Sequence, residues 1–172
     1  MDHETLKSIV VEHASVPVQA DRLIEREQHS RLMELADTPF IVCVTGIRRC
    51  GKSTLLKQRA AKSTLPAYSL NFDDERLIHF TVDDFQILDQ VFHELYGDNG
   101  IYYFDEVQNV TNWERFVRRL YDSGNKVFVT GSNATLLSSE LGTHLTGRNV
   151  ALTLYPFSFG EFLAYSGIDY TD

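Results

Sequence analysis

The chain has 172 residues, of which 43% are hydrophobic and 12% are aromatic, and this is enough to build the core of one ordinary domain. Its 24 acidic and 16 basic side chains give a formal net charge of -8. This charge disfavours the broad basic surface with which proteins bind the phosphates of nucleic acids. The sequence contains no apolar stretch of the roughly 20 residues that a membrane-spanning helix needs. It also lacks an N-terminal secretion signal, so we expect a cytoplasmic protein without membrane contact.

Residues 1–37 carry apolar side chains at helical spacing, and they predict two helices separated near Pro17. We expect this segment to pack as an N-terminal helical unit on a core formed by residues 38–172. Two cysteines and six scattered histidines show neither a disulfide framework nor the spacing of a zinc site.

From residue 38 onward, short apolar runs alternate with helical periodicity. The run Phe40–Val44 is typical of a buried parallel strand. Further strands are predicted at 67–72, 101–104, 126–130 and 150–154, and helices at 54–61, 82–96, 113–121 and from about residue 134. This alternation predicts an α/β fold in which helices cover both faces of a parallel sheet.

The eight residues from Gly46 to Ser53 match the phosphate-loop pattern G-x-x-x-x-G-K-[ST], between a predicted strand and a predicted helix. Glycines let the backbone curl so that its N–H groups point at a phosphate, and the positive end of the next helix adds to the attraction. Lys52 is suited to neutralise β- and γ-phosphate oxygens, and the Ser53 hydroxyl is suited to bind Mg2+. The loop therefore predicts binding of ATP, or ADP, together with Mg2+.

The residues predicted to surround the nucleotide belong to this loop, to the position after it and to one later strand end. They are Gly46, Ile47, Arg48, Arg49, Cys50, Gly51, Lys52, Ser53, Thr54 and Ser132. Cys50 fills a position that the pattern leaves free, so we interpret it as a spacer and not as a nucleophile. Leu23 and Ile24 are candidates to flank the adenine ring, and core packing explains them as well.

Two adjacent carboxylates, Asp105 and Glu106, end the apolar run at 101–104. Asp105 is placed to hold Mg2+ through water. Glu106 is suited to orient the water that attacks the γ-phosphate, or to accept its proton. The competing interpretation is a pair of exposed acids at a strand end, and the phosphate loop about 50 residues earlier favours the catalytic one.

Polar residues also end the next predicted strand, where Ser132 or Asn133 can contact the γ-phosphate or the attacking water. We prefer Asn133, because an amide both donates and accepts hydrogen bonds; capping of the following helix is the alternative. Arg148 precedes the last predicted strand, and it can act as an arginine finger on the nucleotide of a neighbouring subunit. An arginine solvated in a turn explains Arg148 equally well.

The motifs GIRRCGKST, YYFDEVQ, VTGSNA and LTGRNVALTLYPFSFGEF resemble those of predicted bacterial and archaeal ATPases of the AAA+ superfamily, over about residues 22–166. Members carry an N-terminal AAA domain and a C-terminal domain of unknown function. The resemblance implies a three-layer P-loop sandwich with strand order 5-1-4-3-2. It also implies that the helical lid and the C-terminal domain, a partner of this core, lie outside residues 38–172.

In this family's terms, Lys52 and Ser53 belong to Walker A, Asp105 and Glu106 to Walker B, and Ser132 or Asn133 to sensor 1. The first hypothesis is therefore an ATPase that drives a conformational switch. A nucleotide-binding module with negligible turnover is the alternative, and a P-loop kinase is the third. Self-association through Arg148 would accompany the ATPase.

Overall fold

The computed structural model describes residues 1–15, 24–132 and 143–168, and it contains a five-stranded parallel sheet. The strands are β1 (Ile41–Thr45), β2 (Ala67–Asn71), β3 (Ile101–Asp105), β4 (Val127–Gly131) and β5 (Asn149–Thr153). Their order is β2-β3-β4-β1-β5, which is the predicted order read from the other edge. The predicted fold class is thereby confirmed.

Burial follows the position of each strand in the sheet. Every residue of β1 and β4 is buried, because these strands have a neighbour on each side and helices on each face. β2 and β5 form the edges: β2 alternates between buried and partly exposed positions, and β5 buries only Leu152. The apolar runs that the sequence shows are thus longest where the sheet is covered from both sides.

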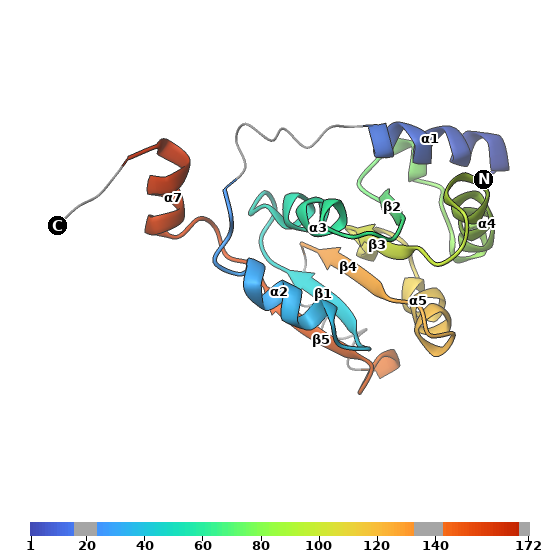
Figure 1. The fold of residues 1–172 in the computed structure, drawn as a ribbon. Helices are drawn as coiled ribbons and strands as arrows, with labels where there is room; N and C mark the ends of the chain where they lie inside the picture. Colours follow the sequence, from blue (N-terminus) through green and yellow to red (C-terminus); the bar gives the residue numbers. More distant parts are fainter. Residues whose placement is uncertain (16–23, 133–142, 169–172) are drawn as a thin grey trace.

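Two hydrophobic clusters lie on opposite faces of the sheet, since alternate residues of each strand belong to different clusters. One cluster combines Cys43 and Phe104 with apolar side chains of α1 (His3–Ser15), α4 (Phe85–Tyr96) and α5 (Trp113–Asp122). The other combines Val44 and Phe128 with side chains of α2 (His29–Ala36) and α3 (Lys52–Ala61). The result is a three-layer sandwich (Figure 1).

The two predicted N-terminal helices are present, but they pack on different faces. α1 buries Leu6, Ile9 and Val10 beside α4 and β2 (Figure 1). α2 buries Leu32 and Leu35 in the other cluster. Residues 1–37 therefore contribute to both layers that cover the sheet.

Several element boundaries differ from the predicted ones. α3 begins at Lys52 and not at Thr54, because Gly51 takes a left-handed conformation (φ 99°) as its N-cap and leaves the next residue free to start the helix. The 3-10 turn η3 (Val82–Asp84) precedes α4, and two more such turns, η2 (Glu75–Leu77) and η4 (Val107–Asn109), follow β2 and β3. The helix predicted from about residue 134 lies outside the described residues.

One helix was not predicted from the sequence. α7 (Phe159–Ser166) follows β5, and Ser158 and Glu161 form a capping box at its N-terminus. It lies beyond the carboxyl ends of the strands (Figure 1). Within the described ranges, none of the helices has the length and apolarity that crossing a bilayer requires.

Candidate nucleotide-binding site

The predicted site residues meet at the carboxyl ends of the strands. The loop from Gly46 to Ser53 connects β1 to α3, Asp105 ends β3, and Glu106 follows directly after it. Between these strands lies β4, which ends at Gly131. Parallel pairing places all three strand ends on one side, so residues that are 50 to 80 positions apart in sequence become neighbours.

The loop backbone needs its glycines. Gly46 has φ 153°, and a Cβ atom built on it would lie 2.2 Å from the carbonyl oxygen of Leu154. Gly51 has φ 99°, which is costly for residues with a side chain, and Arg49 also takes a left-handed conformation (φ 67°). Because α3 starts at Lys52, its first N–H groups have no partner within the helix and are available to an anion.

Lys52 is buried inside the loop, with only 3% of its side chain exposed. Its Nζ atom donates to the carbonyl oxygens of Gly46 at 3.0 Å and of Ile47 at 3.1 Å. It also lies 3.3 Å from Oε1 of Glu106. The ammonium thus crosses the loop, and the Glu106 carboxylate balances its charge.

Glu106 is held by several groups at the ends of the strands. Its Oε2 atom accepts from the backbone N–H of Ser132 at 3.0 Å and from Nε2 of Gln108 at 2.7 Å. Its own backbone N–H donates to Oγ1 of Thr130 at 2.9 Å. Burial alone would raise the pKa of Glu106, but the hydrogen bonds from Gln108 and Ser132 and the charge of Lys52 outweigh burial and lower this pKa. The carboxylate is therefore kept ionised.

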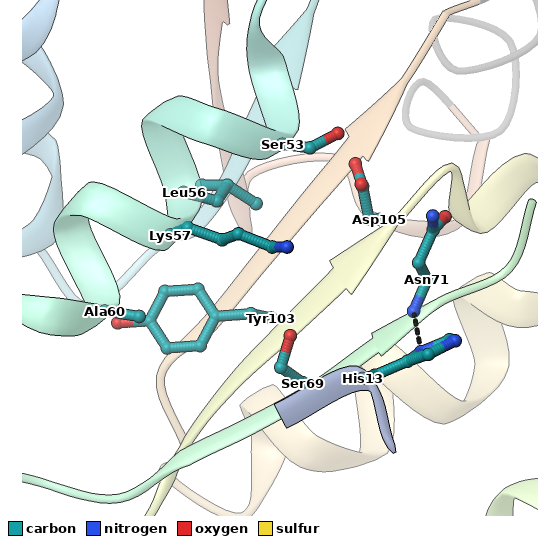
Figure 2. Close-up of a pocket in the computed structure, with 9 residues that line it drawn as sticks. All are labelled: His13, Ser53, Leu56, Lys57, Ala60, Ser69, Asn71, Tyr103 and Asp105. Atoms are coloured by element: carbon teal, nitrogen blue, oxygen red, sulfur yellow. Dashed lines mark hydrogen bonds between the residues drawn. The ribbon is translucent and has the colours of Figure 1, made fainter. Parts of the chain in front are cut away.

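Asp105 and Ser53 line one cavity of about 290 Å³. Figure 2 shows the Ser53 hydroxyl and the Asp105 carboxylate turned toward each other. The hydroxyl of Thr130 donates to Oδ1 of Asp105 and so fixes that carboxylate. A hydroxyl and a carboxylate oxygen are hard ligands of the kind that Mg2+ prefers, so the donor set fits this ion.

Among the other residues of the predicted nucleotide set, Ile47, Arg48 and Thr54 are exposed, whereas Cys50 is buried. Ile47 is 61% exposed, and Arg48 pairs with Asp73 at 2.9 Å on the surface. Cys50 is buried, and its Sγ atom would lie 2.8 Å from a Cβ atom on Gly46. Thr54 is exposed on the first turn of α3. The three exposed side chains therefore lie on the outside of the loop, and the Cys50 sulfur packs against Gly46.

Arg148 lies at the opposite end of the sheet, at the amino ends of the strands, directly before β5. Its carbonyl oxygen accepts from the N–H of Ile41, and its Nε atom lies 3.2 Å from Oδ1 of Asp122. The length of β1 separates this position from the loop of the same chain, about 13 Å at 3.3 Å per residue. The structure therefore does not bring Arg148 to its own loop, and its role toward a neighbouring subunit stays a prediction.

Two predicted residues, Asn133 and Leu23, lie outside the described residues. Ser132 is described, and it contributes its backbone N–H to Glu106. The other adenine candidate, Ile24, is partly buried, and its carbonyl oxygen accepts from Nε2 of Gln58 in α3 at 3.3 Å.

Three residues that the sequence prediction omitted also belong to the site or touch it. Thr130 is fully buried and connects Asp105 with Glu106, and Gln108 supports the Glu106 carboxylate. A polar residue within a buried strand was the available signal for Thr130. Arg26 contacts the loop from the N-terminal segment, and no motif in the sequence marks it.

The strand order, the glycine loop between β1 and α3, and the acidic end of β3 define a P-loop domain of the AAA type, a class that binds nucleotide. The chain belongs to the AAA domain family, whose family model matches residues 38–163. The expected resemblance is confirmed by this match.

Two relatives are much longer than the chain. The uncharacterized protein MJ1544 of Methanocaldococcus jannaschii is 39% identical over 130 residues, which cover 75% of this chain and 29% of that protein. An uncharacterized protein of Haemophilus influenzae is 39% identical over 159 residues, which cover 86% of this chain and 39% of that protein. The chain therefore spans less than half the length of either relative.

A solved structure is similar at low identity. The crystal structure of Saccharomyces cerevisiae RIF2 has a TM-score of 0.56 and 12% identity, and it covers 96% of this chain and 68% of that chain. At this identity the likeness shows the fold alone.

Proposed function

We propose that the domain binds Mg-ATP and hydrolyses it to drive a conformational switch. The observation that supports this most is the ionised Glu106 carboxylate, held by Gln108 and Ser132 and lying 3.3 Å from the ammonium of Lys52. A general base must lie within hydrogen-bond reach of its proton and carry a suitable pKa. The lowered pKa of Glu106 keeps the carboxylate ionised and able to accept a hydrogen bond from the attacking water. Its place between β3 and the loop favours the first condition.

Each group at the edge of the sheet has a proposed task. The N–H groups at Gly51 and the start of α3 hold the β-phosphate, and Lys52 binds β- and γ-phosphate oxygens. Ser53 and Asp105 hold Mg2+, which when bound neutralises the developing charge of the phosphates. Glu106 orients the attacking water and takes its proton, while Ser132 or Asn133 contacts the γ-phosphate.

The Lys52–Glu106 contact suggests how binding prepares hydrolysis. Lys52 donates to two loop carbonyls and lies 3.3 Å from the Glu106 carboxylate. A phosphate offers Lys52 a stronger anionic partner, so the ammonium turns toward it and releases Glu106. The carboxylate is then free to bind water, and the same exchange is the local event that a switch requires.

The position of Arg148 favours a catalytic unit made of more than one chain. Because Arg148 lies at the far edge of the sheet, a finger role requires a second copy whose loop faces this edge. We also propose the division into an N-terminal segment (1–37) and an ATPase core (38–172). The work that hydrolysis drives belongs to the longer protein, which the chain's share of its relatives indicates.

A nucleotide-binding module with negligible turnover is the second candidate. It is favoured by the position of Arg148, which the length of β1 separates from the loop of its own chain. In this function, the nucleotide would stabilise the domain and leave it unhydrolysed.

The deciding experiment measures ATP turnover by the longer protein as a function of its concentration. We expect free phosphate to appear, and the rate per chain to rise with concentration and to lose this rise in Arg148→Ala. Tight nucleotide retention without turnover at every concentration would favour the binding module. Phosphate transferred to an added acceptor, and not released, would favour a P-loop kinase and contradict the proposal.

A further inference from the structure

Arg26 is a buried arginine outside every predicted site, and only 6% of it is exposed. Its Nη1 atom donates to the carbonyl oxygen of Cys50, inside the phosphate loop, at 2.8 Å. Its Nε atom donates to Oε1 of Glu161 in α7 at 2.8 Å. Its Nη2 atom donates to the carbonyl oxygen of Tyr155 at 2.7 Å. One guanidinium thus joins the N-terminal segment, the phosphate loop and the chain that follows β5.

The bond to Cys50 acts on the part of the loop that receives phosphate. In a trans peptide the carbonyl oxygen and the next N–H point in opposite directions. Arg26 holds the Cys50 carbonyl outward, so the N–H of Gly51 points into the loop. A charged donor on the carbonyl also polarises the peptide and strengthens that N–H as a donor. Arg26 and Gly51 lie so close that a Cβ atom on the glycine would be 3.0 Å from Nη1.

Residues 154–161, here called the exit segment, touch the loop at its other glycine. The N–H of Leu154 donates to the carbonyl oxygen of Thr45 at 2.7 Å, directly before the loop. The Leu154 carbonyl oxygen then lies where a side chain at Gly46 would be. The exit segment therefore contacts the start of the loop directly and its end through Arg26.

The Glu161 carboxylate accepts hydrogen bonds from three groups. Besides Arg26, its Oε1 atom accepts from the backbone N–H of Glu27 at 2.8 Å, and its Oε2 atom accepts from the N–H of Ser158 at 2.9 Å. The guanidinium of Arg26 lies 4.9 Å from the ring centre of Phe157. The charges of this pair are thus hydrogen-bonded and partly covered by an aromatic ring, which keeps the pair together in a buried place.

We propose that the Arg26–Glu161 pair is a lock that couples the phosphate loop to α7, with Arg26 as a positioning residue for the loop. The proposal rests on nucleotide binding at the loop and adds a means of transmitting it. A phosphate that orders the loop also orders the Cys50 carbonyl, and through Arg26 it fixes the exit segment. Coupling between sites is reciprocal: the factor by which bound nucleotide strengthens the Arg26–Glu161 pair equals the factor by which the intact pair strengthens nucleotide binding.

The sequence motif LYPFSFGEF, residues 154–162, gains a physical role from this geometry. Its first residue packs on Gly46, its phenylalanine at 157 covers the guanidinium, and its Glu161 holds Arg26. None of these groups is placed to touch phosphate in the proposed site. The motif instead sets the shape of the loop and connects it to α7.

The test uses a double substitution, Arg26→Met with Glu161→Gln, which removes both charges without leaving one of them buried and unpaired. Glutamine keeps one acceptor oxygen, which can receive the N–H of either Glu27 or Ser158, and it adds no charge. We expect the affinity for a fluorescent ATP analogue with Mg2+ to fall about 10-fold, as expected for a lost charge-assisted contact. Hydrogen exchange of residues 158–166 should slow on nucleotide addition in the wild type and remain unchanged in the variant.

Arg31→Met is the matched control, because Arg31 pairs with Glu34 at 2.7 Å on the exposed face of α2. It should change neither the affinity nor the exchange. A merely structural role for Arg26 would lower the thermal stability of the nucleotide-free variant and leave the affinity of its folded fraction unchanged, and that result would overturn the proposal. If the wild type bound no nucleotide, the proposed function itself would fail, and the lock with it.

Discussion

Two lysines at opposite ends of the strands show how different the surroundings of an ammonium group can be. Lys52, at the carboxyl edge, bonds two loop carbonyls and lies 3.3 Å from the Glu106 carboxylate. Lys126, at the amino edge, donates to the carbonyl oxygens of Leu35, Thr38 and Phe40 at 3.0, 2.6 and 2.8 Å. Both side chains therefore donate to backbone carbonyls where the chain turns.

The partners of the two lysines explain their different tasks. Burial, followed by the charge of Arg59, lowers the pKa of Lys126 to about 8, and its three oxygen partners are neutral carbonyls. It ties the end of α2 to the start of β1. Lys52 has an ionised partner, Glu106, directly after β3, so a phosphate can take the place of that partner. A lysine bound only to backbone is part of the scaffold, whereas one shared with a carboxylate is ready to change partners.

The largest effect at the carboxyl edge is expected for Glu106→Gln. The amide keeps the shape of the side chain but cannot accept a proton, so ATP turnover should fall by about 100-fold or more. Nucleotide affinity should stay the same or rise, because Lys52 loses an anionic competitor. Steady-state turnover and equilibrium binding of the same preparation measure both quantities, and unchanged turnover would remove Glu106 from the mechanism.

Lys52→Ala should abolish measurable binding of a fluorescent ATP analogue. Two charge-assisted hydrogen bonds to phosphate are together worth about 3 kcal/mol or more, so the dissociation constant should rise at least about 100-fold. Circular dichroism should show that the variant is folded. Wild-type affinity in this variant would contradict the assignment of the loop.

Lys126→Met should leave nucleotide affinity unchanged and lower the free energy of unfolding by about 1–3 kcal/mol, because carbonyls at the end of α2 lose their donor. The pH dependence provides a second measurement. The pKa of Lys126 is about 8 in the folded chain and 10.5 for a free lysine, so between these values the unfolded chain binds more protons. The stability of the wild type relative to the variant should therefore rise from pH 8 to pH 10.5.

Denaturant titrations of both proteins across this pH range would measure the difference. If Lys126→Met lost nucleotide affinity at a temperature where it is folded, the conclusion that Lys126 has only a structural role would be wrong.

The fold was predictable because its signals are local. The run Phe40–Val44, the glycine loop and the helix after it follow each other within 22 residues, and each predicts its own structure. α7 was missed although Ser158 and Glu161 have the S-x-x-E spacing of a capping box, which is a signal for a helix start that the sequence itself carries. The left-handed Gly51 moved the start of α3 by two residues, since loop closure and not helix propensity decides this boundary.

The site was only partly predictable. Gly46, Lys52, Ser53 and Asp105 lie within short motifs, so their grouping follows from strand order alone. Thr130 and Arg26 act through contacts across 25 and 135 positions, and no spacing in the sequence encodes such contacts. Side chains that bind substrate are thus found from motifs, while those that hold them in place require the folded chain.

The surface around α7 has a consequence for the behaviour of the domain in solution. Tyr155, Phe159 and Phe162 are 66, 67 and 51% exposed, on a chain whose net charge is -8. The charge keeps copies apart, and the rings draw them together. Because salt at about 0.1 M shortens the range of repulsion to about 10 Å while leaving apolar attraction intact, contact through the rings tightens as salt rises. The proposed contact through Arg148 would follow the opposite trend, so ionic strength would separate these two proposed modes of self-association.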